Sequence, residues 1–282
     1  MHALNAPAAT PALSLRIWGA RGSIPTPNIE NLRFGGNTPC VELRHNSDSF
    51  IFDCGTGVRA LGLELDAAAT APLNLNVFLT HFHWDHLQGL PFFSPLYKPK
   101  NCVTFHSALP ADQLREVLSG QMVNPYFPVQ FEVLEGSMNF AQITATPTAF
   151  GPVQISTFAL NHPQGAHGYR ITTSTATIIY ATDHEHGNPA ADARLLAAAH
   201  NADLLILDSQ YTPAEYAEYK GWGHSTWLEA TRLAAAANVR KLILFHHDPA
   251  HDDETMQQIV NEARTHFPNT FAAEEGATFD LP

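Results

Sequence analysis

Residues 75–86 read Leu75-Asn76-Val77-Phe78-Leu79-Thr80-His81-Phe82-His83-Trp84-Asp85-His86. The first five form an apolar run of the length of a buried strand, and a polar cluster follows it. A strand end lets a rigid scaffold present side chains from a loop. His81 and His83, two residues apart, can converge on one cation while the chain stays extended. Asp85 and His86 follow where the loop turns, so the stretch predicts two metal sites, separated by roughly 3.5–4 Å as in two-metal hydrolases.

These histidines also have an ordinary explanation, because the chain contains 16 His in 282 residues and a histidine near a strand is commonly packed or solvated. However, three imidazoles and a carboxylate in one loop would repel each other when protonated and crowd each other when neutral. A divalent ion removes this conflict, and His and Asp are residue types that such ions select. The loop therefore predicts metal binding.

The string His-x-His-x-Asp-His after an apolar strand resembles the signature of the metallo-β-lactamase superfamily of dinuclear hydrolases. Further matches extend the resemblance from about Leu15 to His251. It implies an α/β fold, namely an αββα sandwich of two mixed sheets flanked by helices. We expect one such domain over residues 14–282, preceded by a flexible lead-in over residues 1–13.

The order of predicted elements agrees with a sandwich. Strands fall into two groups, with helices between and after them and no linker, which favours helices on the outer faces of one domain. The predicted strands cover residues 14–18, 41–44, 49–52, 75–79, 102–106, 169–172, 176–180, 204–207 and 241–245. The predicted helices cover residues 59–65, 111–118, 192–200, 226–237 and 254–267, with another starting at His86. An aromatic stretch with two prolines, residues 122–129, is expected to be an irregular flap that either walls a pocket or packs over the core.

Further candidate ligands directly follow predicted strands. By resemblance, His162 joins His81 and His83 at the first site, Asp183 bridges the two ions, and His246 completes the second site. His247 is a rival of His246, but it follows the strand one residue later and its side chain should point the other way. The implied metal ligands are His81, His83, Asp85, His86, His162, Asp183 and His246.

Two other groups of polar residues have open roles. Asp53, in an Asp-x-Gly-x-Gly string, matches the family position that supports the ligand loop, because metal-bound imidazoles need an acceptor for the far ring proton. Its alternative is a turn carboxylate satisfied by backbone amides. The run His184-Glu185-His186 either flanks the site or lies in solvent.

The string Gly221-Trp222-Gly223-His224-Ser225-Thr226 opens a predicted helix, so Ser225 or Thr226 can cap it. It also resembles the His-Ser-Thr loop of the phosphodiesterase branch, which includes the transfer-RNA 3′-processing endonucleases. There the histidine donates a proton or hydrogen bond to the scissile phosphate or leaving oxygen, and a helix N-terminus favours a phosphate. The implied catalytic residues are Asp85, Asp183 and His224.

Composition limits the partners. The formal charge of −12 opposes binding of a long nucleic acid, whose affinity depends on Lys and Arg contacts, but allows a small anionic substrate. No apolar run reaches 18 residues and no secretion signal is evident, so we expect no membrane association. Three cysteines without a Cys-x-x-Cys spacing fit a reducing cytoplasm.

The expected function is a dinuclear metal-dependent hydrolase, a phosphodiesterase that acts on a small nucleotide-like diester through metal-activated water. Nitrogen-rich sites favour two zinc ions, with manganese or iron(II) as alternatives. A lactone or thioester hydrolase, a transfer-RNA 3′-processing endonuclease and a noncatalytic metal or nucleotide sensor are the alternative functions. The family resemblance also suggests a homodimer.

Overall fold

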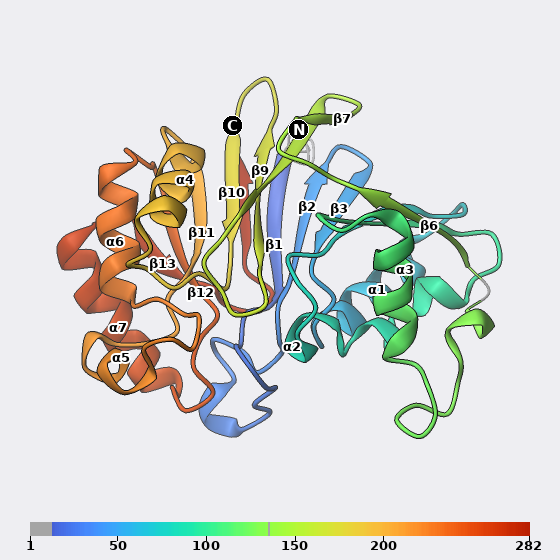
Figure 1. The fold of residues 1–282 in the computed structure, drawn as a ribbon, viewed down its shortest axis with the longest axis horizontal. Coiled ribbons are helices and arrows are strands. Elements are labelled where there is room, and N and C mark those ends of the chain that lie inside the picture. Colours follow the sequence, from blue (N-terminus) through green and yellow to red (C-terminus); the bar gives the residue numbers. More distant parts are fainter. Residues whose placement is uncertain (1–12, 135) are drawn as a thin grey trace, which may run out of the picture.

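Two seven-stranded sheets lie between layers of helices in the computed structural model, which describes residues 13–134 and 136–282 (Figure 1). The expected lead-in lies outside the described residues except for Leu13, which already begins the first strand, β1 (Leu13–Gly19). Both sheets mix parallel and antiparallel pairs, and this arrangement matches the predicted αββα sandwich.

The first sheet carries the ligand loop. Its strands, in spatial order, are β14 (Thr278–Leu281), β1, β2 (Cys40–His45), β3 (Asp48–Phe52), β4 (Asn74–Phe78), β5 (Cys102–Ser107) and β6 (Ser137–Gln142). The pairs from β14 to β3 are antiparallel, and those from β3 to β6 are parallel.

The second sheet repeats this pattern. Its order is β13 (Thr270–Ala272), β12 (Leu242–Phe245), β11 (Leu204–Asp208), β10 (Thr177–Ala181), β9 (His167–Thr172), β8 (Val153–Ala159) and β7 (Thr148–Phe150). The pairs from β7 to β10 are antiparallel, and those from β10 to β13 are parallel.

Apolar residues of the central strands face two different cores. Phe50 and Phe52 of β3 pack between the sheets, whereas Ile51 packs under the helices α1 (Val58–Ala68) and α3 (Ala111–Gly120). Leu205 of β11 likewise packs under α4 (Pro189–Ala199), α6 (Trp227–Ala236) and α7 (Asp253–His266). Side chains alternate along a strand, so strands buried on both faces must be apolar throughout.

Short helices occupy the connections. They are α2 (Trp84–Leu87), α5 (Pro213–Tyr219) and four 3₁₀ turns, η1 (Ile29–Asn31), η2 (Leu90–Phe92), η3 (Ser94–Tyr97) and η4 (Phe131–Val133). The helix expected to start at His86 begins at Trp84, so His86 lies within it. The flap over residues 122–129 has no helix or strand, and its Met122 and Phe127 pack on the core beside α3. None of the helices within the described residues has the length and apolar character needed to cross a membrane.

The parallel strands place the polar loops together. Asp53 follows β3, residues 80–86 follow β4, Asp183 follows β10, and His246 follows β12. The carboxyl ends of parallel strands meet at one edge of a sheet, where α/β proteins commonly bind ligands. The two sheets bring these edges together at the lower centre of Figure 1, next to α2.

Candidate active site

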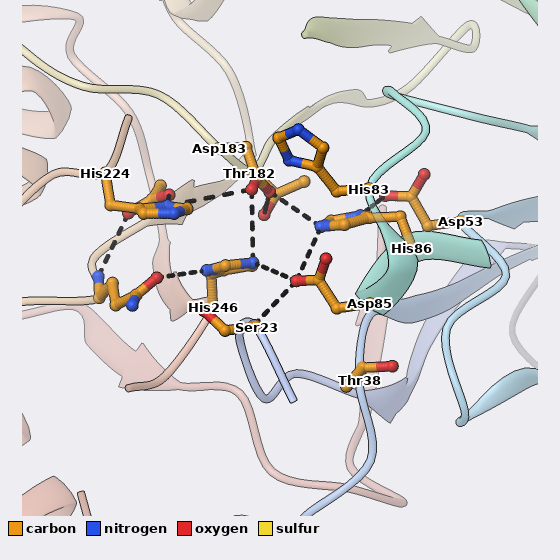
Figure 2. A network of polar contacts seen from close by, with 12 residues as sticks. Ser23, Thr38, Asp53, His83, Asp85, His86, Thr182, Asp183, His224 and His246 are labelled. Carbon is orange, nitrogen blue, oxygen red and sulfur yellow. Dashed lines mark hydrogen bonds and ion pairs between the residues drawn. The ribbon is translucent and has the colours of Figure 1, made fainter. Parts of the chain in front are cut away.

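The seven predicted metal ligands converge at this edge. His81, His83 and His162 each offer a nitrogen, and these three atoms lie within 4.8 Å of one another. Asp85, His86 and His246 form a second group by the same criterion, and His81, His86 and Asp183 form a third. Figure 2 shows Asp183, Asp85, His86 and His246 turned toward one another.

Asp183 lies between the groups. Its Oδ2 is 3.1 Å from Nε2 of His86, and its Oδ1 is 3.4 Å from Nε2 of His246 and 3.6 Å from Nε2 of His81. The hydroxyl of Thr182 donates to Oδ2 at 2.6 Å. The carboxylate thus has the central position expected of a bridging ligand.

Each imidazole of the cluster has one nitrogen held by a neighbouring group, and its other nitrogen lies among the remaining candidate ligands, where it could bind a cation. The acceptors are uncharged oxygens in four cases and a carboxylate in the fifth. The pairs are His81 Nδ1 with Thr80 Oγ1 (3.1 Å), His83 Nε2 with Gln164 Oε1 (3.1 Å), His86 Nδ1 with Asp53 Oδ2 (2.9 Å), His162 Nδ1 with Gly223 O (2.9 Å) and His246 Nδ1 with Gln210 Oε1 (2.9 Å).

The buried nitrogens test whether these residues fit a metal. Nε2 of His81 and Nε2 of His86 are both buried, and neither makes a hydrogen bond of normal geometry within the described residues, although Oδ2 of Asp183 lies 3.1 Å from Nε2 of His86. Buried polar atoms are nearly always satisfied, and a divalent ion would satisfy both nitrogens. With five His and two Asp side chains in the cluster, the residues fit two metal ions.

The pKa shifts of Asp183 and His246 also support a cation site. Burial alone would raise the pKa of Asp183, but His246, His86 and His81 hold it well below its usual range. Burial likewise opposes a charge on His246, yet Asp183 and the hydrogen bond to Asp85 raise its pKa to about 9. The carboxylates are therefore ionised and attract positive charge into a buried site.

Asp53 supports the ligand loop through four hydrogen bonds. Its carboxylate accepts from the backbone N–H of Thr80 (2.9 Å), the Thr80 hydroxyl (3.0 Å), His86 Nδ1 (2.9 Å) and the Tyr180 hydroxyl (2.9 Å). It is fully buried. The geometry agrees with the expected supporting role and not with a simple turn carboxylate.

His224 approaches the cluster from the start of α6. Its ring stacks on that of His246, with centroids 4.7 Å apart. Nδ1 donates to Oδ2 of the buried Asp208 at 2.7 Å, which leaves Nε2 as the nitrogen that can meet a substrate. Thr226 caps α6, whereas the Ser225 hydroxyl donates to the carbonyl of His184.

Asp208 is a functional candidate that the sequence analysis missed. Besides holding His224, its Oδ1 accepts from the N–H of Ser225 (3.0 Å) and of Gln210 (3.2 Å). Its signal was available, because it directly follows the apolar run 204–207, as Asp53 and Asp183 follow theirs.

Of the two neighbouring candidates His246 and His247, His246 lies in the cluster and His247 does not. His246 Nε2 lies 3.1 Å from Oδ2 of Asp85, inside the cluster. His247 points away and donates from Nε2 to the carbonyl of Ala273 at 2.9 Å. Burial lowers the pKa of His247 to about 3, as expected of a packed neutral ring.

The run 184–186 flanks the site without joining the cluster. Glu185 accepts from the N–H groups of Gly221 (2.7 Å) and Gly223 (3.0 Å), so it holds the loop that leads to His224. His184 pairs with Asp192 of α4, and His186 lies against Ser225. None of the three belongs to a ligand group among the described residues.

The loop that follows β1 borders the site next to Asp85. Arg21 is fully buried and donates to the carbonyls of Gly35, Asp248 and His251, which ties this loop to the segment after His246. The N–H of Ser23 donates to Oδ2 of Asp85 at 2.8 Å.

A cavity of about 610 Å³ opens onto the cluster. Its lining includes Ser23, Phe82, His83, Trp84, Gln164 and His224. The flap over residues 122–129 contributes nothing to this lining. The cavity is large enough for a nucleotide-sized ligand.

Comparison with known proteins agrees with this architecture. Ribonuclease Z of Gemmatimonas aurantiaca is 26% identical over 321 residues, which cover 95% of this chain and 96% of that protein. Ribonuclease Z of Methanosarcina acetivorans is 26% identical over 319 residues, covering 96% and 98%.

Solved structures share the fold over nearly their whole length. The metallo-β-lactamase fold protein YhfI of Bacillus subtilis superposes with a TM-score of 0.71 at 18% identity, covering 96% of this chain and 99% of that one. A diphosphatase of the PhnP family gives 0.70 at 16%, covering 96% and 98%. Human tRNase Z, short form, gives 0.65 at 18%, covering 95% and 99%.

A family model described as the β-lactamase superfamily domain matches residues 49–247, which include all seven candidate ligands. The matched region covers most of the chain. With two mixed sheets between helices and a His and Asp cluster at their joint edge, this chain belongs to the metallo-β-lactamase superfamily and is a metal-dependent hydrolase.

Proposed function

We propose that this chain hydrolyses phosphodiester bonds with two divalent metal ions. The observation that carries the proposal is the pair His224 and Asp208 beside the cluster, at 2.7 Å. A carboxylate behind an imidazole stabilises its protonated form, as a proton donor to a leaving oxygen requires. Hydrolysis of a thioester needs such a donor less, because its thiol leaving group is more acidic than an alcohol.

We assign the ligands as the sequence predicts them. His81, His83 and His162 would hold one ion, Asp85, His86 and His246 the other, and Asp183 both. When bound, the ions would activate water and neutralise charge on the phosphate. Asp85 and Asp183 orient the attacking water by accepting its hydrogen bonds. His224 donates a proton from Nε2 to the departing oxygen. The imidazole-rich donor set favours zinc, with manganese or iron(II) as alternatives.

The relatives favour RNA as the substrate. Two relatives named Ribonuclease Z match over nearly their full length, so the transfer-RNA 3′-processing endonuclease is better supported than the small diester that the sequence predicts as the main function. The expectation that no long nucleic acid binds is weakened for the same reason.

A small diester remains the second candidate because of charge. The formal charge is −12, and no Lys or Arg is among the residues that line the cavity. A long polyanion gains affinity mainly from such cations, whereas a small diester can rely on the metal ions.

A panel of substrates, each assayed separately, tests the proposal. The metal-loaded protein is given precursor transfer RNA with a 3′ trailer, bis(p-nitrophenyl) phosphate, a lactone and a thioester, with zinc or manganese. We expect cleavage of both diesters to be lost in His83→Ala. In His224→Ala we expect cleavage of precursor transfer RNA to be lost, because its departing oxygen needs a proton donor, whereas bis(p-nitrophenyl) phosphate should still be cleaved. Cleavage at the 3′ end of transfer RNA at low enzyme concentration would select the RNA substrate. Acyl hydrolysis alone would contradict the proposal and reduce His224 to a structural residue. No turnover of any substrate with both metals bound would favour a sensor.

A further inference from the structure

The side chain of Trp84 is exposed, which leaves the large apolar surface of an indole in contact with water. This side chain is 83% exposed, compared with 62% for Trp222, 7% for Trp18 and 5% for Trp227. Tryptophan is on average a highly buried residue, and exposed apolar surface commonly marks a binding site. In the described part of the chain, the indole of Trp84 has no hydrogen bond and no aromatic neighbour. Packing therefore does not explain why this position carries an indole.

The position of Trp84 joins it to the site. It lies between the candidate ligands His83 and Asp85, at the first residue of α2. It also lines the cavity of about 610 Å³ that opens onto the cluster, together with the half-buried Phe82. A molecule whose phosphate sits at the cluster would have its neighbouring group within this cavity.

The lining indicates which group that is. It holds two aromatic side chains and no Lys or Arg, so it offers flat apolar surface and no cationic contact beyond the metals. Stacking of a nucleobase on an aromatic side chain contributes about 1–3 kcal/mol and tolerates any base. An alkyl group has no π-face with which to stack on the indole.

Resting on the proposed phosphodiesterase function, we propose that Trp84 is a specificity-determining residue that stacks on the nucleobase next to the phosphate at the cluster. The substrate class is then a nucleotide diester, either free or at an RNA end, in preference to a diester without a base. Trp84 contributes to binding of the base and takes no part in proton transfer.

Binding and turnover with matched probes test this assignment separately. Affinities of adenosine 5′-monophosphate and ribose 5-phosphate, which differ by the base, are measured by calorimetry on the metal-loaded protein. We expect Trp84→Ala to weaken the nucleotide by about tenfold, which is the effect of 1.4 kcal/mol, and ribose 5-phosphate by less than about twofold. Trp84→Phe should retain most of the affinity. Tyr126→Ala, which removes an equally exposed aromatic ring outside the cavity lining, is the control and should change neither.

Turnover is followed with the p-nitrophenyl esters of thymidine 5′-phosphate and methyl phosphate, which share a leaving group. Trp84→Ala should lower kcat/KM about tenfold for the nucleoside ester only, with metal content unchanged. Equal losses for both esters, or a wild type that binds the nucleotide no more tightly than ribose 5-phosphate, would overturn the stacking role. A Trp84-dependent preference for the nucleotide, with no hydrolysis of either ester or of precursor transfer RNA, would support stacking while refuting the proposed function.

Discussion

Five side chains of the site depend on an unusual backbone conformation. Ser23, Asp53, Gln164, Asp183 and His246 have φ between 60° and 64°, in the left-handed region. The other non-glycine residues with positive φ in the described chain are all asparagines, which tolerate it. The left-handed conformation costs roughly 1–2 kcal/mol per residue, so the surrounding fold must enforce it. At these positions it turns a side chain into the site directly after a strand or turn.

Gly22 lies so close to the ring of His246 that a larger side chain at position 22 would not fit. A Cβ there would lie 2.4 Å from Nδ1 of His246. That ring is held by Gln210 on one side and faces Asp85 on the other. We expect Gly22→Ala to displace His246 and reduce metal content from about two ions per chain to about one, measured by elemental analysis. Gly120→Ala, where a Cβ meets nothing within 4 Å, is the control and should keep both ions. Two tightly bound ions in Gly22→Ala would contradict the assignment of His246.

The Asp208 and His224 pair predicts a dependence on the leaving group. Asp208→Asn removes the negative charge that faces Nδ1 of His224. We expect kcat to fall roughly 100-fold for a diester with an alkoxide leaving group, because such a group needs a proton donor. With p-nitrophenolate as the leaving group, the loss should be below about tenfold.

His224→Ala should show the same contrast, and metal content should stay near two ions in both variants. Equal losses for both leaving groups would mean that the pair serves structure alone.

Sequence alone identified the residues that follow strands more readily than those that hold them. The seven candidate ligands share a loop or a strand end, and the predicted choice of His246 over His247 agrees with the geometry. Gln210 and Gln164 were missed because each acts on a ring distant in sequence, such as Gln210 on His246, 36 residues later. Asp208 has a recognisable position after an apolar strand, but its partner His224 lies 16 residues later. Such pairing depends on three-dimensional proximity, which no local pattern encodes.

At the scale of elements, long apolar strands were predictable and short peripheral ones were not. β4, β10, β11 and β12 are apolar runs bounded by polar residues, as expected of strands buried on both faces. β13 and β14 have three and four residues, and β14 has alternating half-buried positions. β14 pairs with β1 across the full length of the chain, with Leu13 opposite Leu281. This contact closes the first sheet and is too distant in sequence to be predicted.

β5 carries a buried histidine with a predictable effect on stability. His106 stacks on Phe78 with centroids 4.5 Å apart, its Nε2 donates to Oδ1 of Asn76, and burial lowers its pKa to about 4. Between pH 4 and the ordinary pKa of about 6.5, the unfolded chain binds this proton and the folded chain does not. Stability therefore rises with pH across this window, by at most about 3 kcal/mol from His106.

We expect His106→Gln to flatten the pH dependence of the free energy of unfolding between pH 4.5 and 6.5, as measured by urea titration. The neutral variant loses the proton-linked contribution whatever its absolute stability. His200→Gln, at an exposed position after α4, is the matched control and should keep the wild-type slope. An unchanged slope in His106→Gln would show that His106 titrates normally in the folded protein.

For the whole molecule, the repeated pattern of the two sheets explains why the site lies where it does. Each sheet passes from antiparallel to parallel pairing, and the carboxyl ends of the parallel strands face the same edge. One sheet supplies residues 81–86, and the other supplies His162, Asp183 and His246. We propose that residues 13–282 form one domain, in which bound metal joins the two sheets.

Removal of metal should therefore destabilise the whole molecule in one step. An ion present at 100 times its dissociation constant stabilises the native state by about 2.7 kcal/mol. For a chain of this size that corresponds to a fall of roughly 5–10 °C in Tm on chelation, seen by calorimetry as a shift of a single transition. His83→Ala combined with His246→Ala, which removes a ligand from each site, is the control and should respond little to chelator. Two transitions, of which only one responds to chelator, would show instead that the sheets unfold separately and that the metal belongs to one of them.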